Sequence, residues 1–176
     1  MRAKLISDEV LYPDEAIVLV DRADVDRLKD IAATKTRQRV RLCAHRGSDD
    51  LLHEMLIVHA RDTYVPPHKH PGKSESFHVI DGQVDVVLFA EDGAIDTVMR
   101  MGDFRSGLPF YYRIADPIYH TLLIRSETLV FHETTNGPFL RADTAFAPWA
   151  PDERDAAAVA AYVAALEQRI LAGTPK

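Results

Sequence analysis

Apolar and polar residues alternate along the middle of the chain, from residue 53 to residue 135, with the two-residue period of β-strands. Runs such as HEMLIVHA, QVDVVLFA and TLVFHETT follow one another without an intervening helical pattern. Turn sequences separate them, and Asp81-Gly82 is typical of a tight β-hairpin. This density of short strands predicts an all-β domain, a sandwich or a barrel.

The segments that precede this region predict a small α/β extension. Residues 15–20, EAIVLV, predict a short strand, and residues 22–33, RADVDRLKDIAA, predict a helix with its apolar residues at helical spacing. Residues 37–45, RQRVRLCAH, alternate again as a strand does. We therefore expect an extension over residues 1–36 and a β-domain over residues 37–150.

A helix is predicted at the C-terminal end, within a third segment of residues 151–176. Pro148 and Pro151 break the chain, and residues 152–172 then place apolar side chains at helical spacing. Asp152 is the expected N-terminal cap and Gly173 the expected stop. Trp149 is expected to anchor this segment on the β-domain.

Composition and charge narrow the possible partners. The 176 residues carry a net charge of −6 and a pI of about 5.7, which argues against nucleic acid as a partner. The chain has one cysteine, Cys43, as expected for a protein of the reducing cytoplasm. Its first residues are charged rather than apolar, and no run approaches the length of a membrane span, so we expect neither a signal peptide nor membrane contact.

Candidate metal chemistry is concentrated in the segment PPHKHPGKSESFHVIDG. Side chains at i and i+2 of a strand point the same way, so His68 and His70 project into one space. The turn that follows allows Glu75 to lie alongside them, with Phe77 and Val79 on the same inner face. Imidazole nitrogens and a carboxylate suit Zn, Fe, Mn, Ni or Co.

The same residues carry a resemblance to the cupin superfamily. The spacing H-x-H-x(4)-E-x(6)-G, ending at Gly82, resembles the first cupin motif, and DPIYH resembles the second motif without its glycine. The wider sequence, over roughly residues 37–152, is similar to the WbuC-type cupin fold metalloproteins. The stretches that carry this similarity are RLCAH, SDDLLHEML, YVPPHKHPGKSESFHVIDG, YHTLLIRSE, FHETTNGPF and FAPWAPDE.

The resemblance implies a single double-stranded, jelly-roll-like β-barrel. It also implies one divalent transition metal (Fe, Mn, Zn or Ni) held by His68, His70, Glu75 and His120. Cupins commonly pair through barrel strands, so a homodimer is expected. The WbuC-type family is named for a gene found among O-antigen and surface-polysaccharide genes, and the resemblance implies no defined reaction.

Other residues are candidates for contact with a ligand. Arg41 and His45 lie at i and i+4 of one predicted strand and therefore on one face, where they can bind a carboxylate or phosphate; a solvated strand edge is the alternative. Lys73 lies in the metal-binding turn, and Tyr119 precedes the second motif's histidine. Together with the residual charge of the metal site, Arg41 and His45 favour a small anionic ligand.

An acid or base near the metal would indicate an enzyme. The candidates are Tyr111, Tyr112, His45 and Glu133. His132 and Glu133 have opposite parity on one strand, and the pattern does not decide which of them faces the interior.

Two functions remain open at this point. The first is a metal-dependent enzyme, an isomerase, epimerase or dioxygenase, acting on a small sugar-like or carboxylate-like molecule. The second is a non-catalytic module that binds or senses a small ligand through the same metal. Fold alone does not distinguish them.

Overall fold

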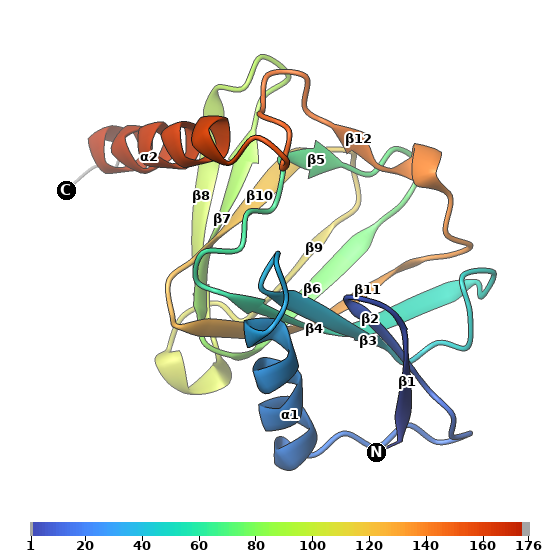
Figure 1. Ribbon diagram of the computed structural model, residues 1–176. Helices are drawn as coiled ribbons and strands as arrows, with labels where there is room; N and C mark the ends of the chain where they lie inside the picture. Colours follow the sequence, from blue (N-terminus) through green and yellow to red (C-terminus); the bar gives the residue numbers. More distant parts are fainter. Residues whose placement is uncertain (1, 174–176) are drawn as a thin grey trace.

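Two β-sheets face each other and enclose the interior of the protein (Figure 1). The computed structural model describes residues 2–173. The seven-stranded sheet has the order β1-β2-β3-β4-β11-β6-β9, and the five-stranded sheet has the order β12-β5-β10-β7-β8. The first sheet consists of β1 (Ala3–Ser7), β2 (Val10–Pro13), β3 (Arg39–Cys43), β4 (Leu52–Ala60), β11 (Thr128–Asn136), β6 (Glu75–Asp81) and β9 (Tyr111–Ile114). The second consists of β12 (Ala145–Phe146), β5 (His68–Lys69), β10 (Tyr119–Ile124), β7 (Gln83–Phe89) and β8 (Ile95–Gly102).

The strands pair antiparallel except for β2 and β3, which are parallel. Within the described residues, no ladder of hydrogen bonds joins the two sheets along their edges. The mostly-β class with a C-terminal helix is therefore confirmed, whereas the expected barrel is not closed. The strands that carry alternating patterns lie where the sequence places them, because one face of each is buried.

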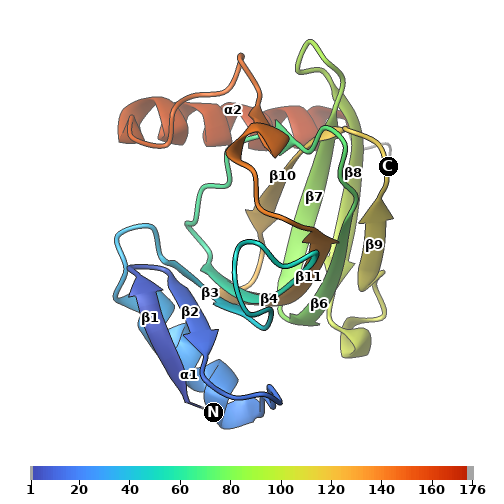
Figure 2. The same ribbon diagram turned by 90° about the vertical axis from the view of Figure 1, so that its right-hand side faces the viewer.

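The core has three layers. Phe77, Phe131, Leu122 and Met101 belong to the cluster between the sheets. A second cluster lies outside the seven-stranded sheet, under helix α1 (Arg22–Ala33), and a third lies between the five-stranded sheet and helix α2 (Ala156–Gly173). Figure 2 shows α1 and α2 on opposite sides of the molecule.

Helix α1 spans the predicted residues. Asp21 caps it by accepting a hydrogen bond from the Asp24 backbone, and the Asp24 carboxylate accepts one from the Asp21 backbone in return. Its buried residues, Leu28 and Ala32, pack against the apolar outer face of β3 and β4. The polar residues of β3, by contrast, face the interior.

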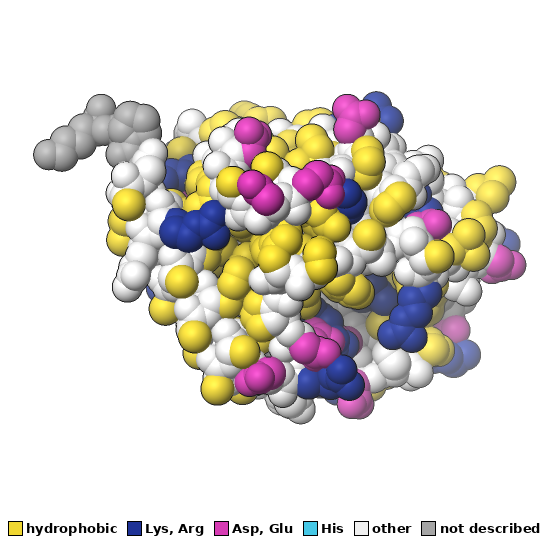
Figure 3. Space-filling model, turned by 90° about the horizontal axis from the view of Figure 1, so that it is seen from above, with side chains coloured by type: hydrophobic (Ala, Val, Ile, Leu, Met, Phe, Trp, Pro, Cys, Tyr) yellow, Lys and Arg dark blue, Asp and Glu magenta, His cyan; other side chains and the backbone are white. Residues whose placement is uncertain are grey.

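Helix α2 begins later than predicted. The carboxylate of Asp155, rather than that of Asp152, accepts from the backbone of Ala158 in the first turn. Trp149 packs against Phe89 and Tyr119, as an anchor should. On the side of the molecule that carries α2, hydrophobic side chains cover much of the surface and charged ones are scattered (Figure 3).

By length and hydropathy alone, α2 meets the requirement of a membrane span. Its 18 residues have a mean hydropathy of 1.2, and 11% of that window is buried. A single helix of this kind is weak evidence, because core helices and signal sequences of other proteins meet the same requirement.

Two predictions of the sequence pattern are wrong. Residues 15–20 form no strand, and Ile17 and Leu19 are exposed because no neighbouring strand pairs with them. The Asp81-Gly82 turn does not make a hairpin of paired strands, since β6 and β7 belong to different sheets. Gly82 has φ = 96°, and a Cβ there would lie 2.4 Å from the carbonyl oxygen of Thr128, so the crossing requires glycine.

Three strands of the seven-stranded sheet were not predicted, and neither were the two-residue strand β12 and the 3₁₀ turns Phe104–Ser106 and Arg141–Asp143. The N-terminal pair β1–β2 and strand β9 are short and lack a clean alternation. Their position in the sheet follows from the neighbour that each one pairs with: β2 with β3, and β9 with β6.

Candidate metal centre

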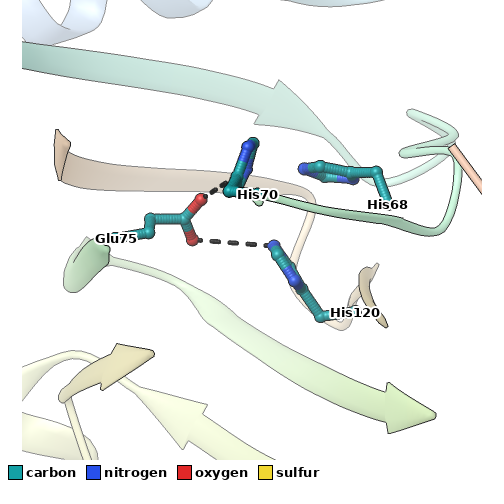
Figure 4. A group of neighbouring side chains, drawn as sticks. All are labelled: His68, His70, Glu75 and His120. Carbon is teal, nitrogen blue, oxygen red and sulfur yellow. Dashed lines mark ion pairs between the residues drawn. The ribbon is translucent and has the colours of Figure 1, made fainter. Parts of the chain in front are cut away.

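The predicted ligand residues meet where the two sheets come together at one end of the interior. His68 of β5 lies directly opposite His120 of β10 in the five-stranded sheet. His70 follows β5, and Glu75 begins β6 in the other sheet. Figure 4 shows the four side chains pointing toward one another from these separate elements.

The ligand atoms of the four side chains form one compact group, and all lie within 4.8 Å of one another. Nε2 of His70 is 3.1 Å from one carboxylate oxygen of Glu75, and Nε2 of His120 is 3.7 Å from the other. The His68 ring centroid is 4.5 Å from that of His120. The group can therefore hold a metal ion.

The backbone fixes the orientation of all three imidazoles. Nδ1 of His68 lies 2.8 Å from the Pro66 carbonyl oxygen, and Nδ1 of His120 lies 2.9 Å from that of Ile118. Nδ1 of His70 lies 3.2 Å from the Asp143 carbonyl oxygen. A carbonyl oxygen can only accept, so each Nδ1 carries the proton and each Nε2 faces the centre of the group. This is the arrangement of metal-ligating histidines.

The electrostatics of the group favour a cation at its centre. Glu75 is buried, which alone would raise its pKa, but the close approach of the His120 and His70 rings outweighs burial and lowers it. Burial lowers the pKa of His120, but the Glu75 carboxylate outweighs burial and raises it, so the carboxylate favours a positive charge at this position. Burial and the other two imidazoles lower the pKa of His68 to about 3, which leaves that ring neutral. A carboxylate oxygen and an unprotonated Nε2 both present lone pairs, so their close approach requires a proton or a metal ion between them.

Tyr112 supports the carboxylate of this group. Its hydroxyl donates to Oε1 of Glu75 at 3.1 Å, and its ring stacks on Phe77 at 5.1 Å between centroids. Burial and the Glu75 carboxylate raise the pKa of Tyr112, so the phenol stays protonated and remains a donor. The tyrosine thus orients Glu75.

The group opens into a cavity of about 1680 Å³ that reaches the inner face of the seven-stranded sheet. Strand register places the side chains of this face in rows across β6, β11, β4 and β3. One row runs Glu75, Thr135, His53 and then His45, which stacks on His53. The next row runs Phe77, Glu133, Met55 and Cys43, and a third row runs Val79, Phe131, Ile57 and Arg41.

This register answers the question of parity on β11. Glu133 lines the cavity, whereas His132 lies opposite His78 on the outer face. Burial and the nearby Glu75 carboxylate raise the pKa of Glu133, so this acid tends to stay protonated. Of the acid–base candidates, Tyr112, Glu133 and His45 lie along the cavity.

The structure places two predicted candidates outside the cavity. Tyr111 is 53% exposed on the outer face of β9, where its hydroxyl bonds to Ser76. Tyr119 has the parity opposite to that of His120 and packs under Trp149 and the ammonium group of Lys69. Strand alternation turns both side chains away from the metal group, and neither lines the cavity.

Lys73 lines the cavity but is already paired. Its ammonium group lies 2.9 Å from Oδ2 of Asp143 and 2.7 Å from the Pro138 carbonyl oxygen. It therefore fastens the segment that carries the His70 partner, and the predicted contact with a ligand stays a prediction.

Sequence reasoning gave no role to three cavity residues. His53 and His59 lie on the inner face of β4, and each has a buried ring nitrogen without a hydrogen-bond partner among the described residues. The Asp143 carbonyl accepts from His70 across more than seventy residues of chain. The sequence did contain one indication that these histidines face inward. His53 and His59 have the same parity along the strand as the apolar residues Met55 and Ile57.

Fold and site together define a two-sheet, mostly-β protein with a His₃Glu group able to hold one metal ion. A family model described as a domain of unknown function (DUF6016) matches residues 20–101. A search of curated proteins finds no match.

Several solved structures are similar in fold. Protein SO0799 from Shewanella oneidensis is 11% identical with a TM-score of 0.49, over 76% of this chain and 81% of that one. The Lactobacillus farciminis oxalate decarboxylase formate complex is 14% identical with a TM-score of 0.44, and the matched part is 55% of this chain but only 27% of that one. The Schizosaccharomyces pombe Cnp3 cupin domain is 13% identical with a TM-score of 0.44, over 56% and 64% of the chains. Similarity at this level carries no information about ligand or activity.

Proposed function

We propose that this chain is a cupin-type metalloprotein that holds one divalent transition metal on His68, His70, Glu75 and His120. The observation that carries the proposal is the backbone pinning of the three imidazoles. Each Nδ1 is held by a carbonyl oxygen, and each Nε2 is directed to the point that Glu75 also faces.

The donor set fits such an ion. Three neutral imidazoles and one carboxylate suit Fe, Mn, Zn or Ni, and leave positions for water or a ligand. Protons alone are a poor substitute, because the adjacent imidazoles repel one another when charged and burial lowers the pKa of His68. A single divalent cation would satisfy all four groups at once.

We further propose that the protein is an enzyme that acts on a small polar or anionic molecule, sugar-like or carboxylate-like. A bound divalent metal would polarise a substrate oxygen or bind O₂ beside the substrate. Glu133 and Tyr112 support an enzymatic role, since both are protonated groups at the cavity that can hold or deliver a proton. The resemblance to WbuC-type proteins suggests surface-polysaccharide metabolism as the setting.

Metal content of the purified protein tests the first proposal. We expect about one transition-metal ion per chain by elemental analysis, and loss of most of it in His70→Ala and in Glu75→Gln. His78→Ala is the matched control, because His78 lies on the same strand as Glu75 but on its outer face. Equal metal content in wild type and both ligand variants would contradict the proposal.

Two further proposals concern the whole protein. We propose that it is a homodimer located in the cytoplasm. Light scattering at micromolar concentration should give about twice the chain mass of 19.7 kDa. A mass equal to that of one chain would exclude the dimer.

A further inference from the structure

Of the two arginines on the inner face of β3, Arg39 has carboxylate partners and Arg41 has none among the described residues. Arg39 lies 3.0 Å from Oε2 of Glu9 and 3.6 Å from Oε2 of Glu153, so its charge is neutralised. Arg41, two residues further on, forms no ion pair within residues 2–173, lines the cavity and is exposed to it. Its guanidinium is therefore available to a ligand.

The positive charge of Arg41 lies close enough to polar residues inside the cavity to affect their pKa values. Burial dominates the raised pKa of both Cys43 and Glu133, and the positive charge of Arg41 acts on each in the lowering direction. Both residues belong to the row of inner-face side chains next to that of Arg41. The guanidinium thus faces the same space as Glu133.

His45 lies four residues further along the chain and lines the same cavity as Arg41. The Glu54 carbonyl oxygen already accepts from the Ala44 backbone, and the Glu54 N–H lies 3.2 Å from Nδ1 of His45. The same Nδ1 lies 3.1 Å from the Glu54 carbonyl oxygen. Because that oxygen already accepts from Ala44, we assign Nδ1 as the acceptor from the Glu54 N–H and Nε2 as the nitrogen that carries the proton. Stacking on His53, at 4.0 Å between centroids, and a T-shaped contact with Tyr12 hold the ring in place.

We infer that Arg41 and His45 form a subsite for the anionic end of a ligand whose other end lies at the His₃Glu group. The placement of the other end of the ligand at the His₃Glu group rests on the proposed function. A guanidinium grips a carboxylate or a phosphate with two parallel hydrogen bonds, and a neutral imidazole N–H adds a third.

The sheet fixes the size of such a ligand. Three strand-to-strand steps separate Glu75 on β6 from β3, which is about 14 Å of sheet at the usual spacing. The arginine side chain covers only part of this distance. A ligand that reaches both ends must therefore be longer than a two-carbon acid, and a sugar phosphate or a medium-length dicarboxylate has a suitable length.

Most other cations that line the cavity are paired: Arg37 and Arg39 share Glu9, and Lys73 is paired with Asp143. Lys35 and Arg141 also line the cavity, but they lie on the segments that follow α1 and precede β12 rather than on the inner face of β3. Among the cations on the inner face of β3, Arg41 is the one that the described residues leave without a counter-ion.

Calorimetric titration of the protein as purified tests the subsite. The probes are glucose 6-phosphate, glucose, adipate and inorganic phosphate, at concentrations up to millimolar. The variants are Arg41→Ala, Arg41→Lys, His70→Ala and, as matched control, Arg39→Ala on the same strand face. We expect at least one of glucose 6-phosphate and adipate to bind wild type more tightly than phosphate and glucose do. In Arg41→Ala the binding of that probe should weaken roughly 10- to 100-fold.

The remaining variants locate the loss. Arg41→Lys should recover only part of the affinity, and Arg39→Ala should bind as wild type does. Elemental analysis of Arg41→Ala should give the metal content of wild type, which separates this subsite from the metal proposal. If neither long anion binds wild type, or if Arg41→Ala binds them equally well, the subsite is wrong even when the metal is present. If anions bind through Arg41 but His70→Ala has no effect on the long probes, the subsite stands alone and its connection to the metal group is wrong.

Discussion

The orientation of each ligand histidine depends on one backbone carbonyl, and these carbonyls differ in their distance along the chain. His68 and His120 each contact the carbonyl oxygen two residues earlier, so the local extended backbone suffices to direct their rings. His70 instead contacts the Asp143 carbonyl oxygen, which the 3₁₀ turn Arg141–Asp143 brings into place. The third imidazole is thus oriented by tertiary structure.

Tyr112→Phe should weaken metal binding without abolishing it. The variant removes the hydrogen bond from the phenol to Oε1 of Glu75 and keeps the ring stacked on Phe77. Loss of a partner of a metal ligand costs about 10- to 100-fold in affinity. Competition with a chelator measures this change.

Tyr111→Phe is the control for that experiment. It removes the neighbouring hydroxyl, which bonds to Ser76 on the outer face, and should leave metal affinity unchanged. An equal loss in both variants would show that Tyr112 has no specific role.

His59→Leu should make the protein less sensitive to acid. His59 is buried against Phe131, and burial lowers its pKa to about 3. The unfolded chain, with an imidazole pKa near 6.5, therefore binds more protons as the pH falls. The contribution of His59 to the free energy of unfolding is therefore fully present above about pH 6.5. Below that pH it decreases by about 1.4 kcal/mol per pH unit, down to about pH 3.

The measurement is the free energy of unfolding of wild type and His59→Leu between pH 7 and pH 4. The difference between the two should change with pH, since other titrating groups are common to both. His78→Leu, on an exposed position of the outer face, is the control. A constant difference between wild type and His59→Leu would contradict the linkage.

At the scale of the elements, strand alternation determines which side chains face the interior. The helices cover the apolar outer faces of the sheets, which would otherwise be exposed to water. The outer face of the five-stranded sheet is covered by α2 through Leu166 and Ile170. An ion network adds to this contact: Arg125 binds the buried Asp85 of β7 at 2.8 Å and also binds Glu167 of α2. The helix is therefore fastened by charge as well as by apolar packing.

Arg125→Met should destabilise the fold by roughly 1–3 kcal/mol, less than for a fully buried pair because Arg125 is partly exposed. The reason is that Asp85 remains buried without its partner. Chemical denaturation measures the effect. Arg154→Met, which removes an exposed pair with Asp152, should change stability by less than about 1 kcal/mol. Equal effects of the two substitutions would show that the network adds nothing specific.

At the scale of the whole molecule, the metal group joins the two sheets but is not part of the apolar core. Glu75 belongs to one sheet and His120 to the other. The three hydrophobic clusters, however, include none of the four candidate ligand residues. The fold should therefore persist without metal, and a bound ion would add a connection between the sheets.

Removal of metal by a chelator should lower stability by linkage without unfolding the chain. For an ion present at 100 to 1000 times its dissociation constant, the loss is about 3–4 kcal/mol. Calorimetry with and without chelator should show one cooperative transition that moves to lower temperature. Absence of any cooperative transition after chelation would show that the ion is required for folding.

Much of this architecture follows from the sequence by itself. The two-residue alternation located the principal strands of both sheets, because a strand with one buried face must alternate. Helix α1 was predicted over residues 22–33 from the helical spacing of Val25, Leu28 and Ile31, and the capping box that the structure adds, Asp21 with Asp24, is equally local. The two-residue period also predicted that His68 and His70 point the same way, whereas Glu75 lies in the other sheet and reaches them through the turn that follows His70.

Tertiary structure alone decided the remaining features, and the reason is that they depend on partners distant in sequence. Whether a turn pairs two strands or passes the chain between sheets depends on which strands lie next to it, so Asp81-Gly82 was misread. The parity of Glu133 became determined only by its register against β4 and β6. Arg39 and Arg41 are equivalent in the sequence pattern, and only the position of Glu9 and Glu153 neutralises the first and leaves the second free for a ligand.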